Sequence, residues 1–211
     1  MKISPSILDA DFSRLQEEIN SIRTADRIHL DIMDGQYVPN TTFRASNISH
    51  VQFSLPLEAH LMVLHPEEYF EEFKSLGCKG ITIHTETQSE KKTLQLLQKL
   101  KNLGIKAGIC IDGFTSVDTV SDSVLHQAEQ VLVMSVKAGK GGQSFMMESL
   151  DKIKTLRSRK FTGEIEVDGG VNLENISKIA HAGADIVVVG SFLMKKEASL
   201  RSEIIAQFQK A

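Results

Sequence analysis

Short strand-like runs rich in isoleucine, valine and leucine alternate with amphipathic helical stretches along the whole of this chain. Such alternation predicts parallel strands joined by right-handed crossover connections. The sequence therefore predicts an α/β protein with a parallel sheet. Its eight predicted strands are Lys2–Ile7, Arg27–Ile32, Leu57–Met62, Gly80–His84, Lys106–Ile111, Gln130–Val136, Glu164–Asp168 and Asp185–Gly190.

The number of units and the first turn distinguish two parallel-sheet architectures. A doubly wound open sheet normally has a G-x-G-x-x-G turn after its first strand, whereas this chain has Leu8-Asp9-Ala10-Asp11 there. Eight units in 211 residues instead fit a single (β/α)8 barrel, the TIM barrel. No linker or low-complexity segment interrupts the pattern, so residues 1–211 are expected to form one domain.

The helical stretches share a recurring C-terminal signal. Three of them end at Gly77, Gly104 and Gly183, and glycine suits the left-handed position that follows a helix. The least periodic stretch, residues 38–54, is expected to be a long loop with a short helix at the mouth of the barrel. Helices are predicted for Phe12–Ile22, Pro66–Leu76, Glu90–Leu103, Ser149–Arg157 and Leu173–Ala182.

Charge and hydropathy exclude several functional classes. The 24 lysines and arginines are scattered among 27 aspartates and glutamates, giving a net charge of −3 and no basic stripe for nucleic acid. No apolar run is long enough to cross a membrane, and the first residues lack a signal peptide's apolar stretch, so we expect a cytoplasmic protein. Cys78 and Cys110 have no C-x-x-C spacing and are expected to be core thiols.

Two of the predicted strands carry histidines in a pattern that suits a metal site. His29 and Asp31 share one face of their strand, His60 lies on the next strand with Met62 beside it, and Asp168 ends the seventh. A lone histidine on an apolar strand is more often a hydrogen-bonded core residue. Burying this many polar groups without a shared partner is costly, however, so one divalent cation (zinc, iron(II), manganese or cobalt) is the more economical interpretation.

Motifs along nearly the whole chain resemble those of the ribulose-phosphate 3-epimerase family, and they occur in the family's order. The resemblance rests on Ser4–Leu8, the H-x-D-x-M-D-G run at His29–Gly35, Val38–Asn40, His60–Met62, Met134–Val136, Gly141–Phe145, Val167–Asn172 and Gly190-Ser191.

This resemblance implies a pentose phosphate pathway isomerase that interconverts ribulose 5-phosphate and xylulose 5-phosphate by inverting carbon 3. It implies that His29, Asp31, His60 and Asp168 bind the metal, and that Asp31 and Asp168 transfer the proton. It also implies a homo-oligomer. The chemistry agrees, because carbon 3 lies next to a ketone, and inversion needs a base on one face and an acid on the other.

Further residues are assigned to substrate binding. Ser6 is expected to bind a substrate oxygen or orient a carboxylate, and the resemblance places Met33 and Met62 near the site with His60. The loops after strands six, seven and eight of a barrel commonly hold a phosphate, so this group is expected at three glycine-containing segments. These segments contain Gly141, Gly142, Gln143, Gly169, Gly170, Gly190 and Ser191.

The chain departs from the family pattern at the mouth of the barrel. The loop after strand six reads Lys137-Ala138-Gly139-Lys140 where a proline and an aromatic residue are usual, and Asp112-Gly113 replaces Asn-Pro. Gln36-Tyr37 stands where His-Phe is usual. Lys137 or Lys140 either contacts the phosphate or is solvated.

These departures leave three alternatives open. They are a 3-epimerase of a hexulose 6-phosphate such as allulose 6-phosphate, a lyase of the hexulose-phosphate synthase kind, and a non-catalytic protein that binds sugar phosphates. The pair His84 and Glu86 is expected to support the site or face the substrate rather than to bind a second metal.

Overall fold

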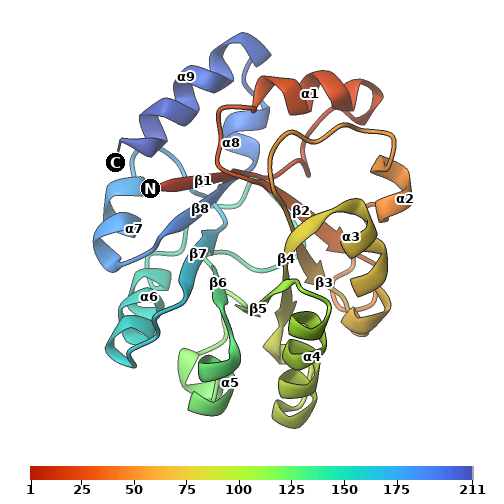
Figure 1. Ribbon diagram of the computed structural model, residues 1–211. Coiled ribbons are helices and arrows are strands. Elements are labelled where there is room, and N and C mark those ends of the chain that lie inside the picture. Colours follow the sequence, from red (N-terminus) through yellow and green to blue (C-terminus); the bar gives the residue numbers. More distant parts are fainter. Residues whose placement is uncertain (211) are drawn as a thin grey trace.

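Eight parallel strands form one sheet in the order β1-β8-β7-β6-β5-β4-β3-β2 in the computed structural model, which describes residues 1–210 (Figure 1). The predicted TIM barrel is therefore confirmed, and the predicted bounds of three strands match those observed. The strands are β1 (Lys2–Pro5), β2 (Ile28–Met33), β3 (Leu57–Met62), β4 (Cys78–His84), β5 (Lys106–Ile111), β6 (Gln130–Met134), β7 (Glu164–Asp168) and β8 (Ile186–Val189).

The sheet closes between β1 and β2, where pairing is reduced to one bridge. Ser6 lies opposite His29 in this bridge, and the N–H of Ile7 donates to the His29 carbonyl at 3.3 Å. Beyond Pro5 the pairing with β2 consists of this bridge alone, so β1 ends two residues earlier than predicted. The residues that close the barrel are thus among those predicted to form the site.

Helices surround the strands and cover them from solvent (Figure 1). The predicted left-handed glycines are confirmed at Gly77, Gly104 and Gly183, whose φ angles are 99°, 73° and 108°. The loop after β2 contains the expected short helix. The α-helices are α1 (Leu15–Ser21), α2 (Ala45–Ile48), α3 (Phe70–Leu76), α4 (Glu90–Asn102), α5 (Asp122–Gln127), α6 (Ser149–Ser158), α7 (Ile176–Ala182), α8 (Ser191–Met194) and α9 (Ala198–Gln209).

Several predicted helices are shorter or divided. The first and second predicted stretches each begin with a 3-10 turn, η1 (Phe12–Arg14) and η2 (Pro66–Glu68), before the α-helix. Two further 3-10 turns, η3 (Thr85–Thr87) and η4 (Val117–Thr119), follow β4 and β5.

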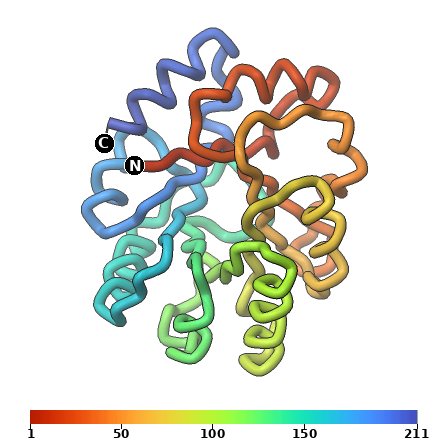
Figure 2. The backbone as a smooth tube through the Cα atoms, viewed as in Figure 1, coloured from red at the N-terminus to blue at the C-terminus, as the bar shows by residue number. Residues whose placement is uncertain are grey.

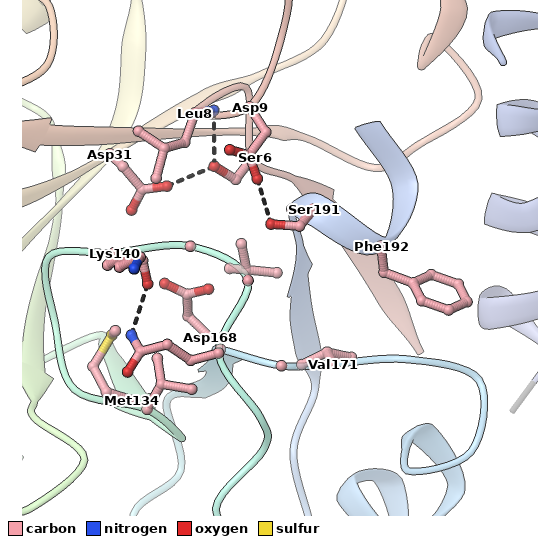
Figure 3. A pocket seen from close by; sticks show the side chains of 18 of the residues that line it. Ser6, Leu8, Asp9, Asp31, Met134, Lys140, Asp168, Val171, Ser191 and Phe192 are labelled. Carbon is pink, nitrogen blue, oxygen red and sulfur yellow. Dashed lines mark hydrogen bonds between the residues drawn. The ribbon is translucent and has the colours of Figure 1, made fainter. Parts of the chain in front are cut away.

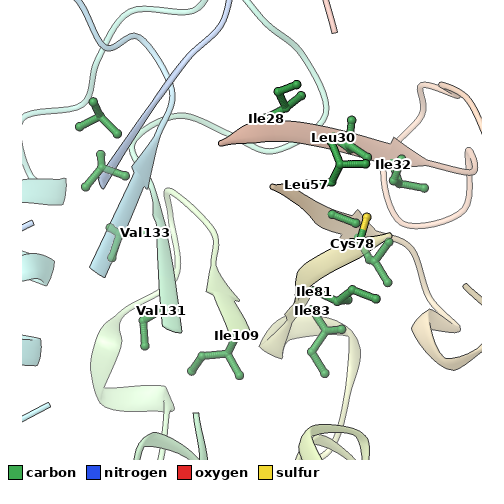
Figure 4. Packing of buried hydrophobic residues seen from close by; sticks show 14 of the residues in the cluster. Ile28, Leu30, Ile32, Leu57, Cys78, Ile81, Ile83, Ile109, Val131 and Val133 are labelled. Atoms are coloured by element: carbon green, nitrogen blue, oxygen red, sulfur yellow. The ribbon is translucent and has the colours of Figure 1, made fainter. Parts of the chain in front are cut away.

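Strand parity separates an apolar shell from a polar interior. Ile28, Leu30 and Ile32 of β2 belong to the large buried cluster between the strands and the helices (Figure 4). The intervening residues His29 and Asp31 face the barrel axis, because successive side chains of a strand point to opposite faces. The apolar shell fixes the register of each strand, so it also fixes which polar groups meet inside.

Arg201 fastens the last helix to the first. Its buried guanidinium donates to Glu18 Oε2 and Ser21 Oγ on α1, both at 2.9 Å, and to the Met194 carbonyl at 2.7 Å. The chain termini lie close together at the other end of α9 (Figure 2). No helix within residues 1–210 has the length and apolar character needed to cross a membrane.

Replacing Arg201 by alanine should lower the free energy of unfolding by about 3–5 kcal/mol, because the Glu18 carboxylate would be left buried without its partner. Chemical denaturation followed by circular dichroism measures this. Arg14→Ala, which removes an exposed arginine of an i,i+3 pair, should leave the denaturation midpoint nearly unchanged. Equal midpoints for all three proteins would contradict the role given to Arg201.

Candidate active site

A cavity of about 340 Å³ opens at the carboxyl ends of the strands (Figure 3). This is the end of a TIM barrel at which active sites lie. Most of the residues predicted for the site line this cavity, while His29 and His60 are buried behind it. The predicted residues in its wall are Ser6, Asp31, Met33, Met62, Gly141, Gly142, Gln143, Asp168, Gly169, Gly170, Gly190 and Ser191.

Asp31 is the point on which the predicted metal ligands converge. One of its oxygens, Oδ1, lies 3.2 Å from His60 Nδ1 and 3.4 Å from His29 Nε2. Its other oxygen accepts a hydrogen bond of 2.5 Å from Ser6 Oγ. Asp168 Oδ2 approaches the same His60 nitrogen at 3.9 Å, and Figure 3 shows Asp168 across the cavity from Asp31.

The donor set of this cluster fits a divalent cation. One ligand atom from each of His29, Asp31, His60 and Asp168 lies within 4.8 Å of the others. His29 Nε2 is buried and has no hydrogen-bond partner, which is unusual for a buried polar atom. Two imidazoles and two carboxylates suit zinc, iron(II), manganese or cobalt.

Glu58 holds the His29 ring from the side away from the cavity. Its Oε1 lies 3.2 Å from His29 Nδ1 and accepts 2.7 Å from Ser4 Oγ. Burial alone would lower the pKa of His29, but Asp31 and Glu58 outweigh it and raise this pKa well above its usual value. In the absence of metal, the two carboxylates therefore favour the positively charged form of the His29 ring, at the place where a cation would otherwise balance their charge.

The two cavity carboxyls differ in their protonation. Burial raises the pKa of Asp31, but His29 and His60 outweigh it and hold this pKa below its usual range. Burial and the nearby charge of Asp31 raise the pKa of Asp168 to about 7. Near neutral pH the site therefore pairs an ionised carboxylate with a carboxyl that readily gains or loses its proton.

His60 also contacts a second histidine behind the cavity. Its Nε2 faces His84 Nε2 at 2.9 Å, and both rings are fully buried. On the far side of His84, Nδ1 lies 3.1 Å from Glu86 Oε2. Burial, helped by His84, lowers the pKa of His60 to about 4, so the His60 ring is neutral at neutral pH.

The glycine loops follow β6, β7 and β8 and line the cavity. Gly170 has a φ of 62°, and a Cβ there would lie 2.4 Å from the Phe145 amide nitrogen, so only glycine fits. Gln143 Nε2 donates to the carbonyls of Lys137 and Lys140 at 2.8 and 2.7 Å. The Gln143 side chain therefore closes its own loop and leaves backbone groups to face the cavity.

Charged residues at the cavity wall were only partly predicted. Lys140 lines it, whereas Lys137 does not, and Asp9 and Lys195 line it without having been predicted. The Asp9 carboxylate accepts a hydrogen bond from Ser191 Oγ (Figure 3). Nothing in the sequence identified Asp9, because this residue of the turn after β1 is distant in the chain from Ser191, and the two meet only when β1 pairs with β8.

Glu58 and Glu166 were also missed, although a signal was present. Each lies two residues before a predicted ligand, Glu58 before His60 and Glu166 before Asp168, so each shares that ligand's inward face. Both are fully or almost fully buried. A polar residue two positions before a ligand on the same strand also faces the barrel interior. This pattern was thus sufficient to predict a second polar layer below the ligands.

Comparisons with known proteins agree with this arrangement. The ribulose-phosphate 3 epimerase family matches residues 2–194. The ribulose-phosphate 3-epimerase of Helicobacter pylori strain 26695 is 42% identical over 93% of this chain and 92% of its own length. The enzyme of that name from Escherichia coli K12 is 39% identical over 90% of this chain and 87% of its own length.

Solved structures show the same architecture. A 3-hexulose-6-phosphate synthase superposes with a TM-score of 0.73 at 16% identity, covering 100% of this chain and 99% of that one. A tryptophan synthase from Pyrococcus furiosus gives 0.73 at 15% identity over 100% and 98%. At such low identity these likenesses show the barrel fold alone.

The raised pKa of Asp168 should appear in the stability of the metal-free protein. A carboxyl whose pKa rises on folding stabilises the fold below its unfolded pKa near 4, and that contribution is lost as pH rises through about 7. In excess chelator, the unfolding free energy of wild type minus that of Asp168→Asn should therefore fall between pH 4 and pH 8. Urea titrations at several pH values measure it, and a constant difference would contradict the assignment.

Proposed function

The chain belongs to the ribulose-phosphate 3-epimerase family, and we propose that it interconverts D-ribulose 5-phosphate and D-xylulose 5-phosphate by metal-assisted, two-carboxylate proton transfer at carbon 3. Its membership identifies it as an enzyme, an isomerase of the epimerase class. The observation that carries the mechanism is the placement of Asp31 and Asp168 on facing sides of one cavity (Figure 3).

Inversion at carbon 3 requires the proton to leave one face and return on the other. Asp31 comes from β2 and Asp168 from β7, so the two carboxyls reach a bound substrate from different strands. One of the two carboxylates accepts the proton on its face while the other, in its protonated form, donates on the opposite face, and the roles exchange in reverse. Ser6 keeps one Asp31 oxygen fixed by its hydrogen bond.

The carbanion formed at carbon 3 is an enediolate, whose negative charge needs stabilisation. His29, Asp31, His60 and Asp168 would hold the cation. A bound divalent cation supplies the positive charge that stabilises the enediolate. No nicotinamide or flavin chemistry is needed for this reaction.

Sulfur-containing side chains make the floor of the cavity apolar. Met33, Met62 and Met134 line it and are nearly fully buried. Their polarizable surface excludes water from the reacting carbon, which strengthens the electrostatic interactions of the carboxylates.

The distal phosphate is assigned to the three glycine-containing loops. Gly141, Gly142, Gly170 and Gly190 bring main chain to one end of the cavity, and Ser191 offers a hydroxyl there. Backbone N–H groups in such loops bind anions. Lys140 and Lys195 line the same cavity and supply positive charge.

The hexulose 6-phosphate alternative is tested by comparing substrates, and the non-catalytic alternative by proton exchange. Two expectations from sequence stay predictions at this stage. They are that residues 1–211 are a single catalytic domain and that the protein is a homo-oligomer.

Asp31→Asn and Asp168→Asn should each lower kcat on ribulose 5-phosphate by about 100-fold or more, because each removes one side of the proton transfer. Deuterium incorporation at carbon 3 and xylulose 5-phosphate formation, followed in deuterated water, measure this loss. Asp34→Asn is the matched control, since this carboxyl lies three residues from Asp31 but outside the cavity wall.

If both variants still incorporated deuterium at carbon 3 at the wild-type rate, the two-carboxylate mechanism would be contradicted. Wild type that carries metal yet neither exchanges nor epimerises ribulose 5-phosphate would contradict the proposed substrate. Allulose 6-phosphate in the same assay then separates altered specificity from a non-catalytic barrel.

Asp9→Asn should lower KM for ribulose 5-phosphate several-fold and leave kcat nearly unchanged. The Asp9 carboxylate engages Ser191 at the proposed phosphate site, so it repels the phosphate and competes for that hydroxyl. The effect should shrink at high ionic strength, because salt screens exposed charges. Asp151→Asn on α6, an exposed change outside the cavity wall, is the control, and a KM that rises in Asp9→Asn would refute the repulsion.

A further inference from the structure

We propose that His84 and Glu86 are positioning residues that hold His60 in the tautomer whose Nδ1 lone pair faces the cation. The three side chains form a buried row in which Glu86 contacts His84 and His84 contacts His60. Neither His84 nor Glu86 lines the cavity, so neither touches the substrate. The inference rests on the proposed function only in taking His60 as a metal ligand.

The contact between the His60 and His84 rings requires one proton between them. His60 Nε2 and His84 Nε2 face each other at 2.9 Å in a fully buried environment. Two lone pairs or two protons at that distance would repel, so one of the two nitrogens carries the proton and the other accepts it. The protonation of His60 and that of His84 are therefore linked.

The protons along His60, His84 and Glu86 can be arranged in two ways, and one of them leaves His60 Nδ1 free for a cation. A neutral His60 that offers Nδ1 to a cation carries its proton on Nε2 and donates it to His84 Nε2. His84 then carries its own proton on Nδ1, where the Glu86 carboxylate accepts it at 3.1 Å. All three groups are satisfied in this arrangement.

The reversed arrangement is disfavoured by Glu86. It would place a proton on His60 Nδ1 and leave a lone pair on His84 Nδ1, directed at a carboxylate oxygen. Asp31 favours this reversed state, since it lies 3.2 Å from His60 Nδ1 and would accept that proton. Glu86 therefore opposes the pull of Asp31 and prepares His60 for the cation.

Glu86 is fixed well enough to have this effect. Its Oε1 accepts the backbone N–H of Asp112 at 2.7 Å, where β5 ends. The Tyr37 hydroxyl lies 3.4 Å from His84 Nδ1 and covers the row from the loop after β2. Burial raises the pKa of Glu86, but the bonds from His84 and from backbone amides outweigh it and lower this pKa to about 2.

His60 and His84 could instead belong to a second metal site together with Cys110, but the geometry and chemistry argue against it. His60, His84 and Cys110 also have ligand atoms close together. Two nitrogens on one tetrahedral zinc are separated by about 3.3 Å, more than the 2.9 Å between these rings. Burial raises the pKa of the Cys110 thiol well above its usual value, which opposes the thiolate that a metal needs.

Cobalt(II) and zinc affinity, measured by chelator competition on the full chain, tests the proposal. Glu86→Gln keeps an oxygen for the Asp112 amide and directs an NH2 group at His84 Nδ1. It should therefore favour the reversed arrangement, in which the His60 proton lies on Nδ1. We expect its metal affinity to fall about 10–100-fold, with the melting temperature of the metal-free protein nearly unchanged. Glu67→Gln, which alters a partly exposed pair with Lys92, is the matched control and should retain wild-type affinity.

Substitutions of His84 separate positioning from packing. His84→Leu fills the space without accepting the His60 proton, so it should weaken metal binding by a similar factor. His84→Gln offers an amide oxygen near the position of Nε2 and should restore much of the affinity. In the zinc-loaded wild type, nitrogen-15 NMR should find the His60 proton on Nε2.

The possible outcomes are distinct. Wild-type affinity in both Glu86→Gln and His84→Leu would overturn the positioning role and leave the proposed function intact. Two cations per wild-type chain, with one lost in His84→Leu, would overturn it in favour of the site with Cys110. A wild-type chain that binds no cation would overturn the metal-assisted mechanism itself.

Discussion

The Asp31 carboxylate is the interaction on which the site depends. Ser6, His29 and His60 contact its two oxygens, and its charge, together with burial, raises the pKa of Asp168. His29 shares β2 with Asp31 and faces the same side, whereas Ser6 follows β1 and His60 lies on β3. Ser6 and His60 reach Asp31 because neighbouring strands of the barrel direct alternate residues toward one axis. A carboxylate buried this deeply is tolerated because every neighbouring group donates to it, carries positive charge or lies where a cation would balance it.

Below this layer, a second polar layer supports the ligands. Arg27 donates to Glu58 at 2.8 Å, and Gln130 bridges Glu58 and Glu166. Burial and the charge of Glu58 raise the pKa of Glu166 well above its usual value, which disfavours a second negative charge beside Glu58. Glu58 is thus held by several donors and in turn holds His29. Together with His84 and Glu86 behind His60, it supports the ligand histidines from outside the cavity.

At the mouth, side-chain contacts hold loops that lack the prolines usual in the family. Asn40 Nδ2 donates to the Gly139 carbonyl at 2.5 Å, which links the loops after β2 and β6. Asp112 accepts the Ala138 N–H at 3.2 Å, and Lys152 donates to the Asp112 carbonyl at 2.6 Å. The altered loop residues are therefore part of a connected rim. Within this rim, Asp9 leaves a negative charge at the cavity wall beside Ser191.

The sequence by itself determined the barrel and most residues of the cavity. Strand and helix periodicity is a local property, and the parity of His29 and Asp31 on one strand needs no tertiary information. The tertiary structure alone decided which distant groups touch, because contacts such as Asp9 with Ser191 depend on the pairing of β1 with β8, which lie far apart in the chain. It also decided the protonation of Asp168, since a pKa reflects burial and neighbouring charges that no local pattern contains.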